Sequence, residues 1–322
     1  MSSAQQVVQQ YPESVKNRTF LLTGASAGSI AGATAVALAE GKPAQIILVG
    51  RTPAKLEVLE KEIHAVNART KVLTFEVDLS SNASVRAGAA KILADERVEV
   101  IDIVITSAHV SSKDHKKSAD GIELVFATGH VGQFLLVNLL KSKISAAAGG
   151  DGGRVVNVTS AGHRLAVCTP GSVFDPLLET GKVPYNSWLQ YGQVKLANIL
   201  FTRSLVQRGW TSVSIHPGPT NTTMNSASAK SGTSLEETMA SVHALVAASP
   251  VKPQIVENDM NNPLQPPEMA AGGVLQAALD PNIPNGAYVV YGKPLEPSTQ
   301  ATDDALAQRL WEMSEQLVGE KF

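Results

Sequence analysis

The sequence predicts an α/β fold with one doubly wound, Rossmann-type parallel sheet of about seven strands. Short apolar runs rich in β-branched residues alternate along the chain with longer stretches of helical character. Most of these runs lack the in-and-out alternation of a half-exposed strand, as expected of strands that are covered on both faces. Alternating strands and helices are typical of parallel sheets whose crossover helices lie on both faces.

The expected elements follow one another in a regular order. The expected strands are Thr19–Thr23, Gln45–Val49, Val72–Val77, Val100–Ile105, Val155–Val158, Ser212–Ile215 and Ala287–Tyr291. The expected helices are Ala31–Glu40, Pro53–Asn67, Ser84–Glu96, Ile122–Leu140 and Tyr191–Arg208. No linker divides the chain, so we expect one domain over residues 1–322, with residues 1–17 as an N-terminal extension.

Residues 221–268 break this rhythm. They contain a run rich in serine and alanine at 226–234, followed by several prolines. A connection of this length inside a compact domain is usually functional or disordered. We expect a lid over a ligand site, and the alternative is a mobile surface insertion.

Composition and charge exclude several classes of protein. Apolar residues make up 43% and charged residues 17% of the chain, which argues against disorder. Lys plus Arg number 27 and Asp plus Glu 29, a net charge of −2, so we expect no nucleic-acid partner. The single cysteine, Cys168, excludes an intrachain disulfide and a cysteine-rich zinc site.

The sequence also bears on where the protein is located and on whether it binds a metal. Its N-terminus has no apolar segment of the signal-peptide kind, and no apolar run approaches the ~20 residues of a membrane span. We therefore expect a cytoplasmic protein without a transmembrane segment. The seven histidines include no pair at helical metal-ligand spacing beside an acidic ligand, so we expect no metal.

The first strand runs into a glycine-rich turn and then directly into a helix. The turn reads Thr-Gly-Ala-Ser-Ala-Gly-Ser-Ile-Ala-Gly over residues 23–32. Glycines let the backbone approach a pyrophosphate, and the free N–H groups of the helix point at it. We therefore expect a dinucleotide phosphate loop rather than a turn that merely needs glycine, with contacts from Gly24, Ser26, Gly28, Ser29 and Ile30.

The end of the second strand indicates which dinucleotide is bound. An acidic residue at this place would bind the ribose 2′-hydroxyl of NAD, whereas an arginine pairs with a 2′-phosphate. The chain has Arg51 here, with Lys55 one helical turn further on. The interpretation is an NADP(H) site, and the alternative is a solvated arginine at a strand end.

Tyr191 and Lys195 are spaced so that both side chains lie on the same face of one helix. A phenol has an ordinary pKa near ~10, and an adjacent ammonium favours the phenolate. The pair is suited to general acid–base work on a carbonyl or a hydroxyl. Ser160 ends another expected strand at the edge of the sheet where α/β proteins bind ligands, and its hydroxyl can donate to a carbonyl oxygen.

These motifs together resemble the short-chain dehydrogenase/reductase family over roughly residues 17–320. The Thr-Gly-x-x-x-Gly turn and the run Tyr-Gly-Gln-x-Lys-Leu-Ala-Asn-Ile-Leu from residue 191 look most like the branch of retinol dehydrogenases and their fungal relatives. The resemblance implies that Tyr191 is the acid/base, that Lys195 lowers its pKa and holds the ribose, and that Ser160 orients the substrate oxygen.

The resemblance also implies further cofactor contacts. They are Asp78 and Leu79 at the adenine, Ser107 and Ala108 after the fourth strand, and Thr222 at the nicotinamide amide. Helices starting near residues 122 and 191 often pair in the family, which implies a homodimer or homotetramer.

The sequence departs from the family pattern at three places. The third glycine of the loop is replaced, and we align Ala31 with it. His109 stands where Asn-Asn-Ala-Gly would have its glycine; it either reaches the substrate pocket or caps a loop. Gly129 stands where the family has a fourth catalytic residue, an asparagine, so we expect a slowed or rerouted proton relay through a backbone carbonyl.

The functional prediction is an NADPH-dependent carbonyl reductase, or an alcohol dehydrogenase in reverse. We expect its small-molecule substrate to be a bulky apolar ketone or aldehyde, with secondary metabolism as one setting. Two alternatives stay open: a non-catalytic NADP-binding scaffold or regulator, and a reductase-fold enzyme recruited to cyclisation or dehydration.

Overall fold

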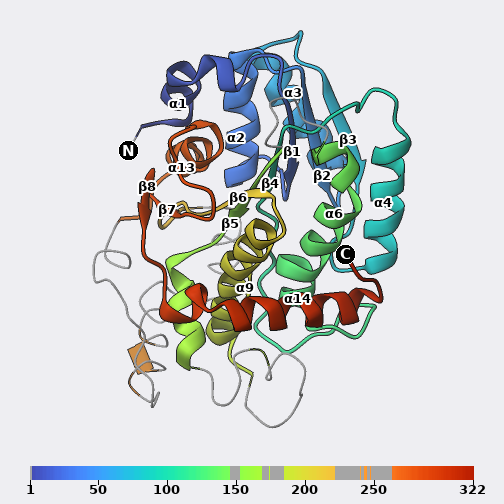
Figure 1. Ribbon diagram of the computed structural model, residues 1–322. Coiled ribbons are helices and arrows are strands. Elements are labelled where there is room, and N and C mark those ends of the chain that lie inside the picture. Colours follow the sequence, from blue (N-terminus) through green and yellow to red (C-terminus); the bar gives the residue numbers. More distant parts are fainter. Residues whose placement is uncertain are drawn as a thin grey trace.

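The computed structural model describes residues 2–145, 153–168, 174, 185–221, 240, 243, 244, 247 and 263–322. These residues form an eight-stranded sheet in the order β3-β2-β1-β4-β5-β6-β7-β8 (Figure 1). The first seven strands pair in parallel, and β8 runs antiparallel to β7 at the edge. The predicted doubly wound α/β class is therefore confirmed.

Each expected strand is present, with shifts of a few residues at its ends. The strands are β1 (Thr19–Thr23), β2 (Gln45–Gly50), β3 (Val72–Glu76), β4 (Ile103–Thr106), β5 (Arg154–Val158), β6 (Thr211–His216), β7 (Tyr288–Val290) and β8 (Lys293–Leu295). The largest shift is at the start of β4. There, the carboxylate of Asp102 accepts hydrogen bonds from the Arg18 guanidinium and the Thr19 N–H, each at 2.8 Å, which ties the strand entrance to β1.

The helices include several that the sequence did not predict. They are α1 (Ala4–Gln10), α2 (Ile30–Leu38), α3 (Pro53–Val66), α4 (Asn82–Ala94), α5 (Leu124–Phe126), α6 (Gly132–Leu139), α7 (Lys141–Ser145), α9 (Ser187–Gln207), α13 (Pro267–Leu279) and α14 (Asp304–Val318). The helix that was expected to start at Tyr191 begins earlier, at Ser187, because the Asn186 side chain caps it. The end of the proposed lid, residues 267 and 268, belongs to α13.

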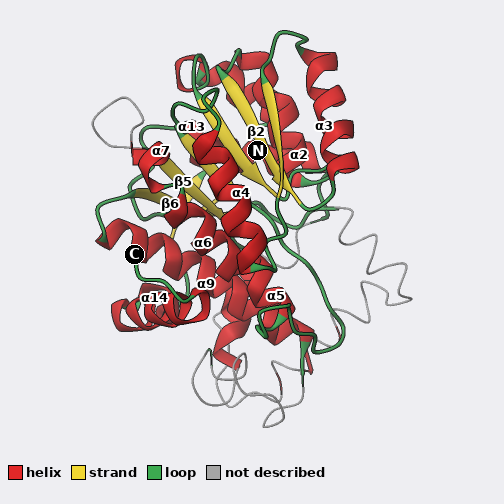
Figure 2. Ribbon diagram, turned by 90° about the vertical axis from the view of Figure 1, so that its right-hand side faces the viewer, coloured by secondary structure: helices red, strands yellow, loops and turns green. Residues whose placement is uncertain are grey.

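The helices cover the sheet in two layers. Helices α1, α2 and α13 lie on one side of the strands and α4 and α6 on the other (Figures 1 and 2). Successive residues of β1 show why the strands read as continuous apolar runs: Leu21 packs in one core cluster, whereas Phe20 and Leu22 pack in the other. Both faces are therefore buried, as expected of a doubly wound sheet.

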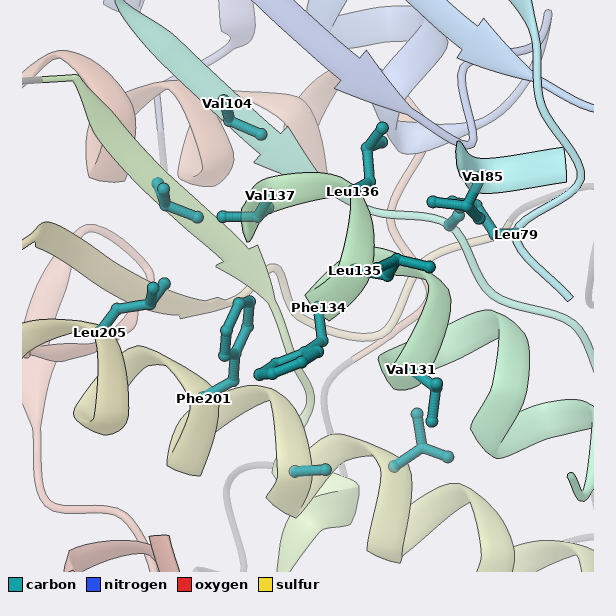
Figure 3. Close-up of a cluster of buried hydrophobic side chains, with 14 of the residues drawn as sticks. Leu79, Val85, Val104, Val131, Phe134, Leu135, Leu136, Val137, Phe201 and Leu205 are labelled. Atoms are coloured by element: carbon teal, nitrogen blue, oxygen red, sulfur yellow. The ribbon is translucent and has the colours of Figure 1, made fainter. Parts of the chain in front are cut away.

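Helix α14 closes the layer that contains α6 and α9. Asp303 caps its start, and Gly319 ends it with φ +70°. Phe134 of α6 and Phe201 of α9 point toward each other in the core, with ring centroids 5.6 Å apart (Figure 3). Trp311 of α14 joins them, 4.9 Å from the Phe134 ring. The packing of α14 thus supports the two helices that lead to the candidate site.

The expected continuous helix over Ile122–Leu140 is interrupted. Ala127–Val131 form a π-helical turn between α5 and α6. The turn brings Gly132 so close to the chain after β3 that a Cβ at this position would overlap the carbonyl oxygen of Leu79. The π-turn is a local rearrangement of helical hydrogen bonding, of a kind often found at functional sites.

Within the part of the chain described, no helix is long and apolar enough to cross a membrane. The expected lid over 221–268 falls almost entirely outside the described residues, as does Thr222.

Candidate active site

The glycine-rich turn after β1 has the backbone conformation that its glycines allow. Gly24 and Gly28 have φ values of +70° and +71°, which other residues rarely adopt. A Cβ at Gly24 would come within 2.6 Å of the Ala108 Cα, so the turn packs directly on the chain after β4. Gly28 is exposed at the tip of the turn, where its backbone is free to approach a ligand.

Ser29 organises the start of α2. Its hydroxyl donates to the Ser26 carbonyl at 2.7 Å and accepts from the Gly32 N–H at 2.9 Å, which caps the helix. A Cβ at Gly32 would overlap the Ser26 carbonyl oxygen. The close approach of turn and helix occurs at Gly32, one residue after the Ala31 that we aligned with the third glycine, and Ala31 is an ordinary buried alanine.

Gly32→Ala tests this geometry. We expect a loss of several degrees in Tm and of dinucleotide binding, because the new Cβ must displace the backbone of the turn. The matched control is Gly273→Ala in α13, where the nearest atom to a new Cβ is 3.9 Å away. The control should be neutral or stabilise by up to about 1 kcal/mol through helix propensity; equal behaviour of both variants in a thermal melt would contradict the assignment.

The other predicted cofactor residues lie along one edge of the sheet. Arg51 follows β2 and is exposed, and Asp78 and Leu79 follow β3. Ser107 and Ala108 follow β4, and both donate their N–H groups to the Thr23 hydroxyl, at 3.0 and 3.3 Å. In the strand order β3-β2-β1-β4 these positions are contiguous, and the order reverses between β1 and β4, which is where such sheets bind ligands.

The three predicted catalytic residues come together at the same edge, after β5 and on α9. The Ser160 hydroxyl hydrogen-bonds the Tyr191 side chain and accepts from the Gly162 N–H at 3.0 Å. The ammonium of Lys195 is 5.7 Å from the centre of the Tyr191 ring and donates to the Val158 carbonyl at 3.2 Å. Ser160 and Tyr191 keep part of their surface exposed, whereas Lys195 is buried.

Burial sets the protonation of this group. Desolvation raises the pKa of Tyr191 above its ordinary value, and the Ser160 hydrogen bond partly offsets this. Burial lowers the pKa of Lys195 to about 8. The sequence predicted a lowered pKa for Tyr191 with both Lys195 and a charged nicotinamide beside it; among the chain's own groups, desolvation sets the opposite direction. A protonated phenol beside the Ser160 hydroxyl is arranged to donate to a carbonyl oxygen.

Comparison with known proteins agrees with this arrangement. Residues 18–169 match the family model described as short chain dehydrogenase. Human retinol dehydrogenase 13 is 33% identical over 313 residues, covering 95% of this chain and 86% of that protein. The chain belongs to the short-chain dehydrogenase/reductase family. It falls in the branch that resembles retinol dehydrogenases, as the sequence predicted. Members of the family are oxidoreductases that use a nicotinamide cofactor.

Two further relatives extend the comparison. The chloroplastic short-chain dehydrogenase TIC 32 A of Brassica napus is 30% identical over 314 residues, covering 94% of this chain and 89% of that protein. Among solved structures, a protein of Mycobacterium paratuberculosis has a TM-score of 0.67 at 26% identity, with 96% of both chains covered. The NADPH-bound carbonyl reductase from chicken fatty liver shares the fold, with a TM-score of 0.59 at 16% identity over 88% of this chain and 95% of that one.

The residue that replaces the family's asparagine, Gly129, lies inside the π-turn and is buried. Its carbonyl oxygen accepts from the Asn198 and Gln133 side-chain amides, each at 2.9 Å. The carbonyl through which we expected a rerouted proton relay is therefore engaged by two side-chain amides, and the relay itself stays a prediction. Gln133 also accepts from the Thr23 hydroxyl at 2.9 Å, which links the π-turn to the glycine-rich loop.

Other polar residues behind the site were not singled out from the sequence. The buried His163 donates from Nδ1 to the Ser160 carbonyl at 2.7 Å and accepts at Nε2 from the Ser298 N–H at 3.0 Å. These two bonds fix a neutral tautomer and hold the backbone of Ser160. The sequence offered one signal for this role of His163, its position three residues after Ser160. The second hydrogen-bond partner of His163, Ser298, is distant in the sequence. Among the described residues, no group of three histidine, cysteine or acidic side chains is placed to hold a metal ion.

Proposed function

We propose that this protein is an NADPH-dependent carbonyl reductase, or an alcohol dehydrogenase in the reverse direction. The observation that carries the proposal is the convergence of Ser160, Tyr191 and Lys195 at the sheet edge that also bears the glycine-rich turn. The turn fits a dinucleotide pyrophosphate, because its positive-φ glycines let a phosphate approach the backbone at the N-terminus of α2.

The chain's own residues supply the positioning and the proton. A bound reduced nicotinamide would supply the hydride. The Ser160 hydroxyl holds the carbonyl oxygen, and the Tyr191 phenol, whose pKa is raised, donates a proton to it as negative charge develops. Lys195, buried next to the Tyr191 ring, binds the ribose and stabilises the phenolate that forms. In the oxidative direction the Tyr191 phenolate accepts the hydroxyl proton of the alcohol.

Substitution of Arg51 tests the proposed preference for NADPH over NADH directly. The guanidinium pairs with a 2′-phosphate, and charge-assisted contacts contribute about 1.5–3 kcal/mol. We expect Arg51→Asp to raise the Kd of NADPH about 10- to 100-fold in a calorimetric titration and to leave that of NADH within threefold. The control is Arg69→Asp, because Arg69 is also exposed but precedes β3 at the opposite edge of the sheet. An equal effect on both cofactors would contradict the assignment.

We also propose that residues 1–322 form one reductase domain. Residues 221–268 would serve as a lid over the substrate site, and the substrate would be a bulky apolar ketone or aldehyde. The length of that segment supports the idea, and secondary metabolism is one setting for such a substrate. Comparable turnover of small polar ketones and large hydrophobic ones would contradict it.

The second candidate, a non-catalytic NADP-binding scaffold, is favoured by the two departures at His109 and Gly129. A cytoplasmic location and pairing into a homodimer or homotetramer stay predictions. Sedimentation of the purified chain tests the pairing.

A further inference from the structure

His109 and Gly129, which are twenty residues apart in the sequence, lie against each other beside Tyr191. A Cβ at Gly129 would come within 3.2 Å of the His109 Nδ1 and 2.5 Å of the Val194 Cγ1. The space that a side chain at 129 would take is therefore filled by the imidazole and by Val194. A side chain at position 129 would require Val194 to move and the His109 ring to shift by a few tenths of an ångström.

The imidazole contacts the catalytic phenol. The ring centroids of His109 and Tyr191 are 5.2 Å apart and the ring planes meet at 82°, a T-shaped contact. Trp188, three residues before Tyr191 on α9, makes a second T-shaped contact at 6.0 Å and 78°. T-shaped arrangements are the preferred geometry of aromatic pairs. The Tyr191 ring thus has one aromatic neighbour from its own helix and one from the chain after β4.

The state of the imidazole favours packing over proton transfer. Burial and the charge of Lys195 hold the pKa of His109 well below its usual range, so the ring is neutral at physiological pH. Its Nδ1 is buried and has no hydrogen-bond partner among the described residues. A group with so low a pKa is a poor acid or base near neutrality, whereas a neutral ring is suited to contact with a phenol.

We propose that His109 is a positioning residue that fixes the orientation of the Tyr191 ring, and that Gly129 provides the room for it. The inference rests on the proposed function, since the orientation matters only where the phenol delivers a proton to a bound carbonyl. A small displacement of a reacting group lowers turnover much more than it alters binding. The contact should therefore affect kcat and leave the binding constants nearly unchanged.

The first test compares His109→Ala, which removes the ring, with His109→Phe, which keeps a ring and removes both nitrogens. We expect His109→Ala to lower kcat at least tenfold, with KM and the Kd of NADPH within threefold of the wild type. His109→Phe should recover kcat to within about threefold. Unchanged kcat in His109→Ala would overturn the proposal, and so would an equal loss in both variants, because the nitrogens would then be the essential feature.

The control variant is His115→Ala, which removes a second T-shaped histidine–tyrosine contact, at 5.7 Å and 84° to Tyr185. It should keep kcat within threefold; a loss equal to that of His109→Ala would indicate general loosening and overturn the assignment to Tyr191. A wild-type protein that binds NADPH but reduces no carbonyl would instead contradict the proposed function, so the two failures are distinguishable.

A double-mutant cycle gives an independent test. Gly129→Ala places a methyl group against both the Val194 Cγ1 and the His109 Nδ1, and part of its effect on kcat should come from displacing the His109 ring. When the ring is already absent, the same methyl group has less to displace, so the loss in Gly129→Ala/His109→Ala should be smaller than the product of the two single losses. Simple multiplication of the two losses would show that the residues act independently and overturn the proposed coupling.

Discussion

Tyr191→Phe should lower kcat for carbonyl reduction about 10³-fold while the Kd of NADPH stays within threefold. The substitution removes one oxygen, which is hydrogen-bonded to the Ser160 side chain, and leaves the T-shaped contacts of the ring with His109 and Trp188 in place. Positioned proton transfer contributes typically 10²- to 10⁴-fold, and a 10³-fold loss corresponds to about 4 kcal/mol of activation free energy. Single-turnover oxidation of NADPH by a carbonyl substrate, which is reduced to the alcohol, measures the loss.

The control for this prediction is Tyr11→Phe, which also removes a phenol oxygen. Tyr11 accepts a hydrogen bond from the Gln276 side chain at 2.7 Å, next to α1 and away from the sheet edge that carries the site. Its kcat should match that of the wild type. Retained turnover in Tyr191→Phe would show that another group delivers the proton, whereas a protein that binds NADPH and is unaffected in its cellular role by Tyr191→Phe would support the scaffold alternative.

Acidification from pH 7 to pH 5 should destabilise the fold by about 6 kcal/mol. Burial lowers the pKa of His130 and of His163 to about 3, and that of His216 to about 4. In the unfolded chain a histidine titrates near ~6.5. Between these values the unfolded state binds more protons than the folded state, so stability is fully present above pH ~6.5 and falls as the pH drops toward the folded pKa.

The size of this loss in stability follows from the difference between the pKa of each histidine in the folded and in the unfolded chain. At pH 5 each of the three histidines contributes about 1.5 × 1.36, or ~2 kcal/mol, to the loss. His109, whose pKa burial also holds well below its usual range, adds to the loss, and Glu123 opposes it, because burial raises the pKa of that carboxyl. A loss of this size is a large part of the 5–15 kcal/mol that stabilises a typical protein. Urea unfolding at pH 7 and pH 5 measures it, and equal free energies of unfolding at the two values would contradict the burial of these rings.

His130→Phe isolates one contribution to the acid effect. His130 lies among the rings of Phe126, Phe134 and Phe201, and its Nε2 is 2.8 Å from the Ser314 hydroxyl. A phenylalanine keeps the ring and removes the titration, so the variant should lose about 2 kcal/mol less than the wild type between pH 7 and pH 5. The matched comparison is His64→Phe, because His64 lies on α3 with part of its surface exposed, and its Nε2 is 3.1 Å from the Thr70 carbonyl oxygen.

The alternation of apolar runs and helices was enough to predict the sheet, because burial on both faces leaves a direct mark on composition. The missed helices α13 and α14 do bury apolar residues, whereas two shorter missed elements, α1 and β8, have less to mark them. Helix α1 is only seven residues long, and its start carries a local signal that the sequence analysis did not use, the Ser3–Gln6 capping box. Strand β8 has three exposed residues, so nothing in Lys293–Leu295 distinguishes it from a turn.

The candidate site was predictable where its residues share one local motif. The spacing of Tyr191 and Lys195 and the glycines after β1 are features of single segments. The contact between His109 and Gly129 joins two segments, and the role of Gly32 depends on the carbonyl of Ser26. The pKa of Tyr191 depends on how far the surrounding chain excludes water. Such properties follow from tertiary packing and leave no pattern in the sequence.

The most direct test of the central claim is thermal unfolding of the purified protein with NADPH and, separately, with NADH. A ligand at one hundred times its Kd adds about 2.7 kcal/mol of stability, which for a chain of this size raises Tm by several degrees. The account predicts that shift with NADPH and a clearly smaller one with NADH. Absence of a shift with either dinucleotide would mean that the glycine-rich turn binds no such cofactor, and would contradict the reductase assignment.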